Sequence, residues 1–331
     1  MFIHKAYCFR IYPTKKQTEL IKKTIGCSRF VFNHFLAIWK DTYKETGKGL
    51  TYHSCSSKLP SLKNEYEWLK EVDSIALQSS LKNLADSFSR FFKKQNKAPR
   101  FKSKNNNVQS YKTKYTNGNI AIIGNKIKLP KLGLVRFSKS RDVEGRILHT
   151  TVRRNPSGRY FISILVETEV QPLDKTETSI VIDLGITDFA IFSDGRKIGN
   201  NKFTIKAEKK LKKEQRKLSR RALRAKNNGM NLLDAKNYQK QKIKVARLHE
   251  KVMNQREDFL NKLSTEIIKS HDVVCIENLN TKGMLRNRKL AKSSPGIGTR
   301  YYTWHRKRTR RSRNSRINRL PNKRRPRCND C

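Results

Sequence analysis

Acidic residues are scarce in this chain of 331 residues: 27 Asp and Glu stand against 75 Lys and Arg, which leaves a formal charge of +48. An excess of this size would self-repel strongly without a polyanion, so nucleic acid is the leading partner. Long apolar runs are absent as well, since none approaches the roughly 20 residues of a transmembrane helix. The N-terminus lacks the apolar core of a signal peptide. We therefore expect a cytoplasmic protein with no membrane partner, acidic lipid being the alternative polyanion.

Cysteine is also sparse and scattered. Four cysteines stand alone in apolar or mixed sequence: Cys8, Cys27, Cys55 and Cys275. Isolated cysteines of this kind are typical of buried free thiols and do not form a disulfide framework. Only Cys328 and Cys331 form a C-x-x-C pair, which is half of a zinc knuckle. Because two ligands alone do not make a structural zinc site, we expect no Zn²⁺ in this chain.

The first third of the chain is predicted to be a strand followed by helices. Residues 5–11 alternate in polarity and end at Pro13, and Thr14 is a candidate N-cap for a helical segment that Gly26 interrupts. A pair of helices is expected there, and a helix-turn-helix is the alternative. A short helix is predicted near residues 59–69. Apolar residues that recur every three or four positions predict a further core-facing helix over about residues 74–94.

Short strands are predicted in the middle of the chain. Turns rich in Asn and Gly separate five of them, over residues 119–123, 126–129, 134–137, 147–153 and 160–167. An antiparallel barrel or sandwich fits this spacing, and the strand near residue 8 could complete it.

A basic loop precedes these strands. Residues 93–104 place Phe101 among Arg100, Lys102, Lys104 and further lysines. Cations interleaved with an aromatic ring are typical of a surface that follows a nucleic acid backbone. The alternative interpretation is a solvated run of charge.

Two apolar runs in the second half of the chain each end in an acid. Residues 179–186 contain Asp183, and residues 272–280 contain Glu277. We interpret the first run as a central strand covered on both faces, where an ionised carboxylate requires a metal or a basic partner. If the second strand returns parallel to the first, both carboxylates lie on one face within the span of a two-metal site. The alternative is two unrelated acids at strand ends.

A basic helical hairpin is predicted between these two runs. A β-hairpin over residues 188–198 comes first, with Asp194-Gly195 as its turn. Helical periodicity then extends over residues 205–269 and is broken near residues 227–229. Such a helical hairpin could pack on the sheet while its basic side lies along a phosphate backbone.

Seven blocks, in a fixed order between residues 5 and 293, resemble the TnpB (OrfB) family of transposon-encoded, RNA-guided DNA endonucleases. They are FRIYPT at 9–14, WLKEVDS at 68–74, PRFKSK at 99–104, LPKLG at 129–133, IDLG at 182–185, QRKLSRR at 215–221 and IENLN at 276–280. The resemblance implies an α+β multidomain fold. A wedge-type β-barrel (1–15 and 110–172) would contain an inserted helical recognition lobe (16–109). An incomplete RuvC-like domain of RNase H fold (178–293) and an Arg-rich tail (294–331) would follow.

The resemblance also implies the activity. The chain would be an RNA-guided DNA endonuclease, described in older work as a transposase, with a guide RNA and a double-stranded DNA target as partners in the prokaryotic cytoplasm and nucleoid. Asp183 and Glu277 would be the first two RuvC carboxylates and would bind Mg²⁺ or Mn²⁺. The basic residues expected to contact nucleic acid are Arg100, Lys102, Lys104, Arg216, Arg220 and Arg221.

The chain departs from the family after Ser293. The family has a helix, four zinc cysteines and a third catalytic aspartate there, whereas residues 300–331 hold thirteen Arg or Lys and a single acid, Asp330. We expect this tail to be disordered, with no third catalytic acid, and cleavage to be weak. A nuclease-deficient RNA- and DNA-binding protein is therefore the alternative function. A strand-exchanging transposase is less favoured because no catalytic Tyr or complete acidic triad is apparent.

Overall fold

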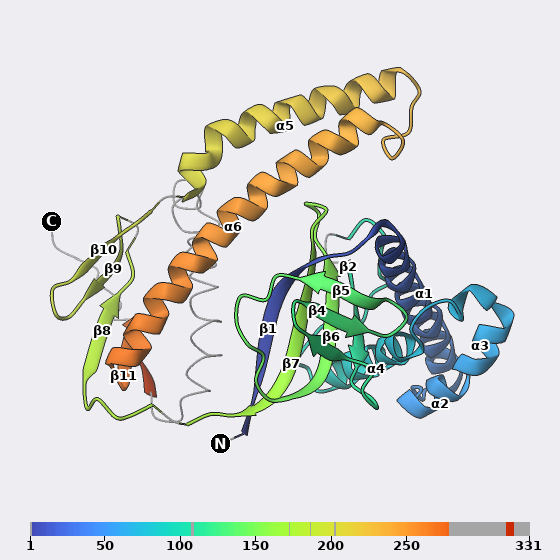
Figure 1. Cartoon of the computed structure of the whole chain (residues 1–331), viewed down its shortest axis with the longest axis horizontal. Helices are drawn as coiled ribbons and strands as arrows, with labels where there is room; N and C mark the ends of the chain where they lie inside the picture. Colours follow the sequence, from blue (N-terminus) through green and yellow to red (C-terminus); the bar gives the residue numbers. More distant parts are fainter. Residues whose placement is uncertain are drawn as a thin grey trace, which may run out of the picture. The chain divides into compact units, whose positions relative to one another are not determined.

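The computed structural model describes residues 2–106, 109–171, 173–185, 187–201, 203–277 and 316–320, and the chain divides into two compact units. One unit comprises residues 2–169 and the other begins at residue 170. In the first unit, helices gather on one side of a seven-stranded sheet (Figure 1). The second unit combines a smaller sheet with two long helices. None of the described helices has the length and apolar character needed to cross a membrane.

The seven-stranded sheet is antiparallel throughout, in the order β2-β6-β7-β1-β5-β4-β3. Its central strand β1 pairs with β7 on one side and β5 on the other. The strands are β1 (Phe2–Tyr12), β2 (Gln109–Lys114), β3 (Ala121–Ile123), β4 (Lys126–Leu129), β5 (Gly133–Phe137), β6 (Arg146–Arg154) and β7 (Tyr160–Glu169). The predicted antiparallel sheet, with the strand near residue 8 as part of it, is confirmed.

The helices of the first unit include one that is longer than expected. Helix α1 (Lys15–Thr46) begins at the predicted N-cap, Thr14, which forms a capping box with Gln17. It continues through Gly26, so the expected pair of helices is wrong. A Gly in a helix costs about 0.5–1 kcal/mol relative to Ala, and the buried residues Ile21 and Phe35 on either side keep one apolar face continuous.

Shorter helices complete the first unit. They are α2 (Tyr52–Ser57), α3 (Leu59–Glu65), the 3₁₀ helix η1 (Glu67–Leu69) and α4 (Ser74–Phe92). The predicted core-facing helix α4 is confirmed, with Asp73 as its N-cap. Its buried Leu77, Leu81 and Leu84 share a hydrophobic core with α1.

The second unit contains a five-stranded mixed sheet in the order β10-β9-β8-β11-β12. Its strands are β8 (Ser179–Asp183), β9 (Asp188–Phe192), β10 (Lys197–Gly199), β11 (Val273–Glu277) and β12 (Arg316–Leu320). Strand β11 is parallel to both β8 and β12, whereas β9 is antiparallel to β8 and β10. The predicted β9–β10 hairpin is confirmed, and Gly195 takes the left-handed conformation that its turn requires.

Strand β12 corrects the expectation that the Arg-rich tail is disordered. Residues 316–320 pair in parallel with the whole of β11, from Val273 to Glu277. The edge of β11 offers unpaired backbone groups, and a passing segment of chain can satisfy them whatever its charge. The remainder of the tail, including Asp330, Cys328 and Cys331, lies outside the described residues.

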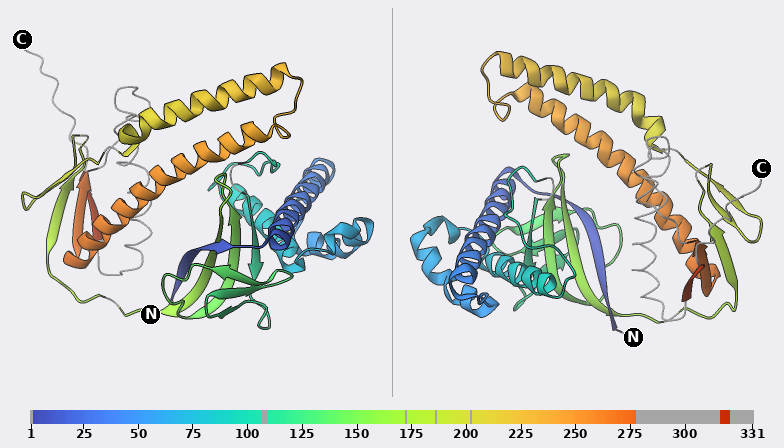
Figure 2. Two further views of the ribbon diagram at one scale, coloured as in Figure 1. Left: turned by 45° about the horizontal axis from the view of Figure 1, so that its top comes forward. Right: turned by 180° about the vertical axis from the view of Figure 1, so that it is seen from behind.

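A helical hairpin joins β10 to β11, as predicted. Helices α5 (Phe203–Asn227) and α6 (Lys236–Ser270) lie side by side in both views of Figure 2. The chain reverses direction after α5 with Gly229 in the left-handed conformation. The last turns of α6 bury Leu260, Leu263 and Ile267 against Ile180 and Ile182 of β8. The sheet is therefore covered on one face by α6.

Candidate functional site

Strand β8 carries Asp183 at its C-terminal end and is buried on one face alone. Ile180 and Ile182 are 2% and 1% exposed, whereas Val181 is 44% exposed and Asp183 is also exposed. The expectation of a central strand covered on both faces is therefore wrong for β8. Asp183 lies on the same exposed face of β8 as Val181. Its carboxylate therefore needs no buried partner to offset a desolvation penalty.

The parallel pairing of β8 with β11 brings the two predicted acids to the same edge of the sheet. The last registered pair is Ile182 with Ile276, and both residues are buried. Asp183 and Glu277 come directly after this pair, on neighbouring strands that lie about 4.8 Å apart in a β-sheet. The prediction that the second acid-bearing strand returns parallel to the first is confirmed. The side chain of Glu277 lies outside the described residues.

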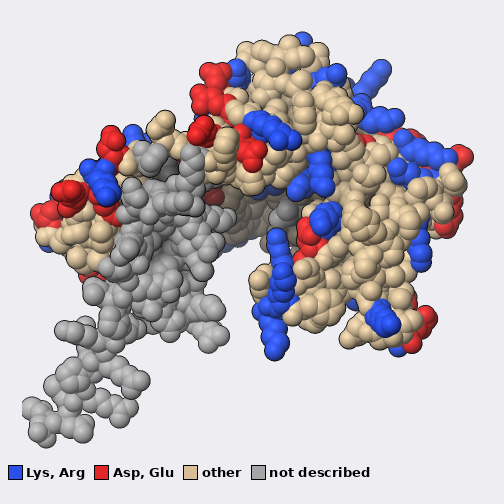
Figure 3. All heavy atoms as spheres, turned by 90° about the horizontal axis from the view of Figure 1, so that it is seen from below, with Lys and Arg blue, Asp and Glu red and all other residues tan. Residues whose placement is uncertain are grey.

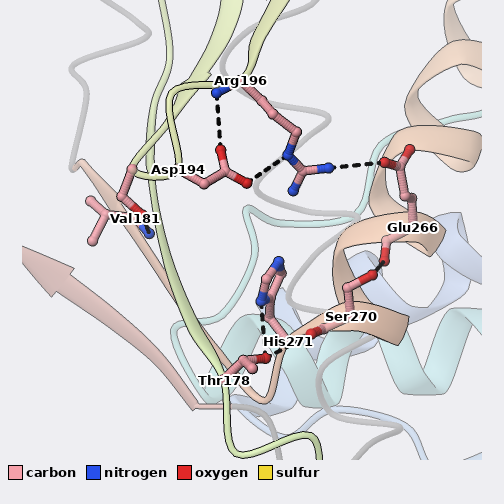
Figure 4. A network of polar contacts seen from close by, with 8 residues as sticks. Thr178, Val181, Asp194, Arg196, Glu266, Ser270 and His271 are labelled. Carbon is pink, nitrogen blue, oxygen red and sulfur yellow. Dashed lines mark hydrogen bonds and ion pairs between the residues drawn. The ribbon is translucent and has the colours of Figure 1, made fainter.

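Other acids near this sheet are already engaged. Figure 4 shows Arg196 between Asp194 and Glu266, with its Nε 2.6 Å from Asp194 Oδ2 and its Nη1 3.3 Å from Glu266 Oε1. The backbone N–H and guanidinium of Arg196 hold the pKa of Asp194 below its ordinary value. In the part of the chain that the structure describes, no group of three or more His, Cys, Asp or Glu side chains is arranged to hold a metal ion. Asp194 and Glu266 are therefore structural acids.

The start of β8 is fixed by a residue that sequence reasoning missed. Asp272, just before β11, accepts hydrogen bonds from the backbone N–H groups of Thr176 and Glu177 through Oδ2, both at 2.9 Å. The Thr178 hydroxyl donates to the Ser270 carbonyl oxygen at 2.7 Å (Figure 4). These bonds tie the polar linker before β8 to the junction of α6 and β11. They set the two strands in the register that aligns their acids.

The basic loop of the first unit is fastened to α1. The Asn33 side chain donates to the Lys102 carbonyl oxygen at 2.9 Å and accepts from its N–H at 2.8 Å. The Lys102 ammonium lies 3.7 Å from the centre of the Phe32 ring, and Lys40 lies 4.6 Å from that of Phe101. Apolar surroundings lower the pKa of Lys102 to about 8, even though the residue as a whole is exposed.

The three predicted loop cations therefore differ in their surroundings. Arg100 and Lys104 are exposed. Lys102, by contrast, directs its charge onto an aromatic ring of α1, a favourable cation–π contact. The sequence does not distinguish the three cations, because Phe32 and Asn33, the partners of Lys102, lie about 70 positions away.

The predicted arginines of α5 also divide into two groups. Arg216 and Arg220 line an open surface hollow together with Lys212, Gln215 and Ser219. Residues 209, 212, 213, 216 and 220 recur at helical spacing and give this face of α5 a continuous row of cations. Arg221 instead donates to the Asn237 carbonyl oxygen at 2.9 Å and to Gln241 Oε1 at 3.3 Å, and so links α5 to α6.

A buried carboxylate holds the two helices in register. Glu214 of α5 is 5% exposed and accepts a 2.7 Å hydrogen bond from Gln241 Nε2 of α6. Lys244 Nζ lies 3.3 Å from the same carboxylate. The Gln241 amide and then Lys244 lower the pKa of Glu214 from its ordinary value. The sequence signal for this residue is weak, since Glu214 is one acid among many lysines.

One face of the molecule shows no single cluster of the described cations (Figure 3). On the face drawn in Figure 3, Lys and Arg side chains project from several separate places, with groups of Asp and Glu between them. Individual contacts therefore distinguish the cations of this chain.

Two family profiles match the chain. One, described as "Probable transposase", matches residues 163–288, which include residues 170–277 of the second unit but not β12. The other, described as "Helix-turn-helix domain", matches residues 1–48, where the structure has strand β1 and the single helix α1. The helix-turn-helix alternative is therefore not the structure of this segment.

Similar proteins extend over most of the chain. A "Putative RNA-guided DNA endonuclease" of Streptomyces pristinaespiralis is 32% identical over 296 residues, which cover 88% of this chain and 71% of that protein. "Putative RNA-guided DNA endonuclease InsQ" of Escherichia coli K12 is 33% identical over 300 residues, with 89% and 71% covered. Among solved structures, a Cas12f1–sgRNA–target DNA complex has a similar fold, with a TM-score of 0.50 at 12% identity over 96% of this chain and 89% of that one.

Proposed function

This chain is a member of the TnpB (OrfB) family, and from that premise we propose that it is an RNA-guided DNA endonuclease of a transposable element. The observation that carries the proposal is the parallel register of β8 and β11, which aligns Asp183 and Glu277 at one edge of the sheet. Two carboxylates on adjacent strands suit metal-assisted cleavage of a phosphodiester. The relatives that bear this activity in their names span most of the chain.

The fold supports an assignment of domains. We assign the seven-stranded sheet to a wedge-type barrel, and α1 to α4 to the recognition lobe inserted between β1 and β2. The second unit is the RuvC-like nuclease domain. The boundary between the two compact units, at residues 169 and 170, lies within three residues of the expected end of the barrel.

Asp183 and Glu277 are the proposed ligands of Mg²⁺ or Mn²⁺. Hard carboxylate oxygens suit either ion, and the exposed edge that carries Asp183 leaves room for solvent and for substrate. The ion, when bound, lowers the pKa of a water nucleophile and stabilises the leaving oxygen. Asp183 would fix the position of the scissile phosphate from β8. The anchor that Asp272 provides would keep Asp183 aligned with β11.

The proposed partners are a guide RNA and a duplex DNA target. Base pairing would read the target sequence while cations of this chain contact the phosphates. Arg100, Lys104, Arg216 and Arg220 are exposed and are the proposed contacts. Lys102 and Arg221 would instead hold the basic loop and the helical hairpin in place, as their contacts with Phe32 and α6 suggest.

A cleavage assay tests the proposal. Protein purified with its RNA is incubated with Mg²⁺ and either a duplex that matches the guide or a duplex with altered bases. We expect cleavage of the matched duplex alone, and a loss of about 100-fold or more in Asp183→Asn, because positioned metal ions supply several kcal/mol and 1.36 kcal/mol is tenfold. Asp194→Asn, which alters an acid already paired with Arg196, is the control and should retain cleavage.

Three results would contradict the proposal. Cleavage that proceeds without RNA would contradict RNA guidance, and cleavage that survives in Asp183→Asn would rule out this active site. Guide-dependent binding of the duplex without any cleavage would identify the nuclease-deficient alternative. The expectation of weak cleavage rests on residues 294–331, most of which lie outside the described residues, and stays a prediction.

A further inference from the structure

Three aromatic rings form a stack that leads from the core of the first unit to its surface. The rings of Trp39 and Phe88 are parallel within 9°, with centroids 4.3 Å apart. Phe88 and Phe92 follow at 6.2 Å and 24°. Exposure rises along the stack, from 5% at Trp39 through 8% at Phe88 to 57% at Phe92. The outermost ring therefore presents aromatic surface to solvent.

Backbone hydrogen bonds cap the end of α4, which carries Phe92. The N–H of Lys94 donates to the Phe91 carbonyl oxygen at 2.9 Å, and that of Gln95 donates to the Arg90 carbonyl oxygen at 2.9 Å. These two bonds make a Schellman C-cap, in which glycine is the usual residue at the left-handed position. Here that position is Lys94, with φ of 53°. A cation thus occupies a place where glycine would relieve backbone strain.

The surroundings of Phe92 are cationic. From Ser87 to Arg141 the chain contains neither Asp nor Glu. Arg90, Lys93 and Lys94 flank Phe92 and are exposed. Cations thus precede and follow a flat apolar ring in the sequence. This combination suits both parts of a nucleotide, because a base stacks on the ring while a phosphate contacts the cations.

We propose that Phe92 is a stacking platform for an unpaired nucleotide of RNA, whose base would extend the stack of Trp39, Phe88 and Phe92 and whose phosphates would contact Arg90, Lys93 and Lys94. The inference deepens the proposed function, since it names the form of RNA that this part of the chain recognises. RNA is the assigned strand because a guide RNA has to be held before any target DNA arrives.

The positive charge around Phe92 makes a second copy of this chain an unfavourable partner at this ring. Two copies that met at Phe92 would bring their acid-free segments, each with Arg90, Lys93 and Lys94, towards each other. Like charges at an interface are strongly unfavourable. A polyanion with aromatic bases satisfies both the ring and the cations.

The test is a binding assay on the full chain with a labelled, unpaired oligoadenylate RNA. A DNA strand of the same sequence and an RNA duplex serve as comparisons. Phe92→Ala should weaken binding of the unpaired RNA by about 5- to 150-fold, the loss that follows from removing one stacked base. Phe92→Leu should show much of the same loss because it keeps apolar area without a flat ring, whereas Phe92→Trp should retain affinity. Binding of the RNA duplex should not change.

Two further variants separate binding from folding. Lys94→Gly should lower RNA affinity while its melting temperature is no lower than that of the parent, since glycine suits the left-handed position. Phe2→Ala is the matched control, because Phe2 is 72% exposed but lies in β1, outside the acid-free segment. It should bind RNA as the parent does.

Several results would overturn the inference. The affinity of Phe92→Ala for unpaired RNA could be unchanged, or its affinity for the RNA duplex could fall equally. The loss of affinity could also be confined to the DNA strand, or the oligomeric state could change while RNA binding does not. The proposed function fails separately, through the cleavage assay. A parent chain that cleaves its matched duplex while Phe92→Ala binds unpaired RNA normally would refute the stacking platform alone.

Discussion

At the scale of single residues, the structure separates cations that the sequence presents as equivalent. Lys102 and Lys104 are two positions apart in one basic loop, yet the Lys102 ammonium lies over the Phe32 ring while Lys104 is exposed. Desolvation lowers the pKa of Lys102 from about 10.5 to about 8, so its charge is a net cost to folding despite the cation–π contact with Phe32. The charge of Lys104 remains free to meet a phosphate.

The Lys102 environment predicts a pH dependence of stability. Between about pH 8 and 10.5 the unfolded chain binds more protons at Lys102 than the folded chain does, so this group makes the free energy of unfolding rise with pH. Lys102→Met removes the contribution. Urea unfolding across this window should therefore show that the parent becomes more stable relative to Lys102→Met as pH rises. A flat difference for Lys102→Met would refute the assignment.

Lys104 carries a different prediction, which concerns RNA affinity. Lys104→Ala should weaken binding for all RNA sequences alike and reduce the slope of log affinity against log salt by about 0.7–0.9, the effect of one lost phosphate contact. Lys23→Ala is the control, because Glu71 lies 2.6 Å from the Lys23 ammonium and offsets its charge. A changed sequence preference in Lys104→Ala would show that the residue reads bases instead.

At the scale of elements, the sequence pattern predicts most strands and helices. It fails for the elements whose extent or burial is decided by tertiary packing. Residues 109–114 contain two lysines, a glutamine and a serine, yet they form β2 because Tyr111 and Thr113 alternate into the core. Gly26 predicts a break in the helix, although the apolar face of α1 continues through it. The acid-bearing strand β8 was assigned two covered faces, because Ile-Val-Ile does not show which residue packs under α6.

The continuity of α1 predicts that Gly26→Ala is stabilising. Apart from the neighbouring residues and the backbone of α1 itself, no heavy atom lies within 4 Å of the place that a Cβ would occupy. Ala in place of Gly within a helix should add about 0.5–1 kcal/mol to the free energy of unfolding. Chemical unfolding of the two proteins measures this. A loss of stability in Gly26→Ala would mean that the helix is interrupted at this residue, as in a helix-turn-helix.

At the scale of the whole molecule, the candidate site depends on residues far apart in sequence. Asp183 and Glu277 stood out as acids at the ends of apolar runs, and the family resemblance gave their roles. Their alignment depends on the parallel pairing of β8 with β11 and on Asp272, whose hydrogen bonds to Thr176 and Glu177 no periodicity reveals. Asp194 and Glu266 resemble metal ligands in composition, and only their ion pairs with Arg196 exclude them.

The central claim is that the edge formed by Asp183 and Glu277 holds the divalent ion. Thermal unfolding with and without Mn²⁺ tests it most directly, because an ion bound only by the folded state adds about 2.7 kcal/mol of stability at 100 times its Kd. The parent and Asp194→Asn should both melt several degrees higher in saturating Mn²⁺, and Asp183→Asn should lose most of that shift. A Mn²⁺-induced shift that persists undiminished in Asp183→Asn would contradict the account.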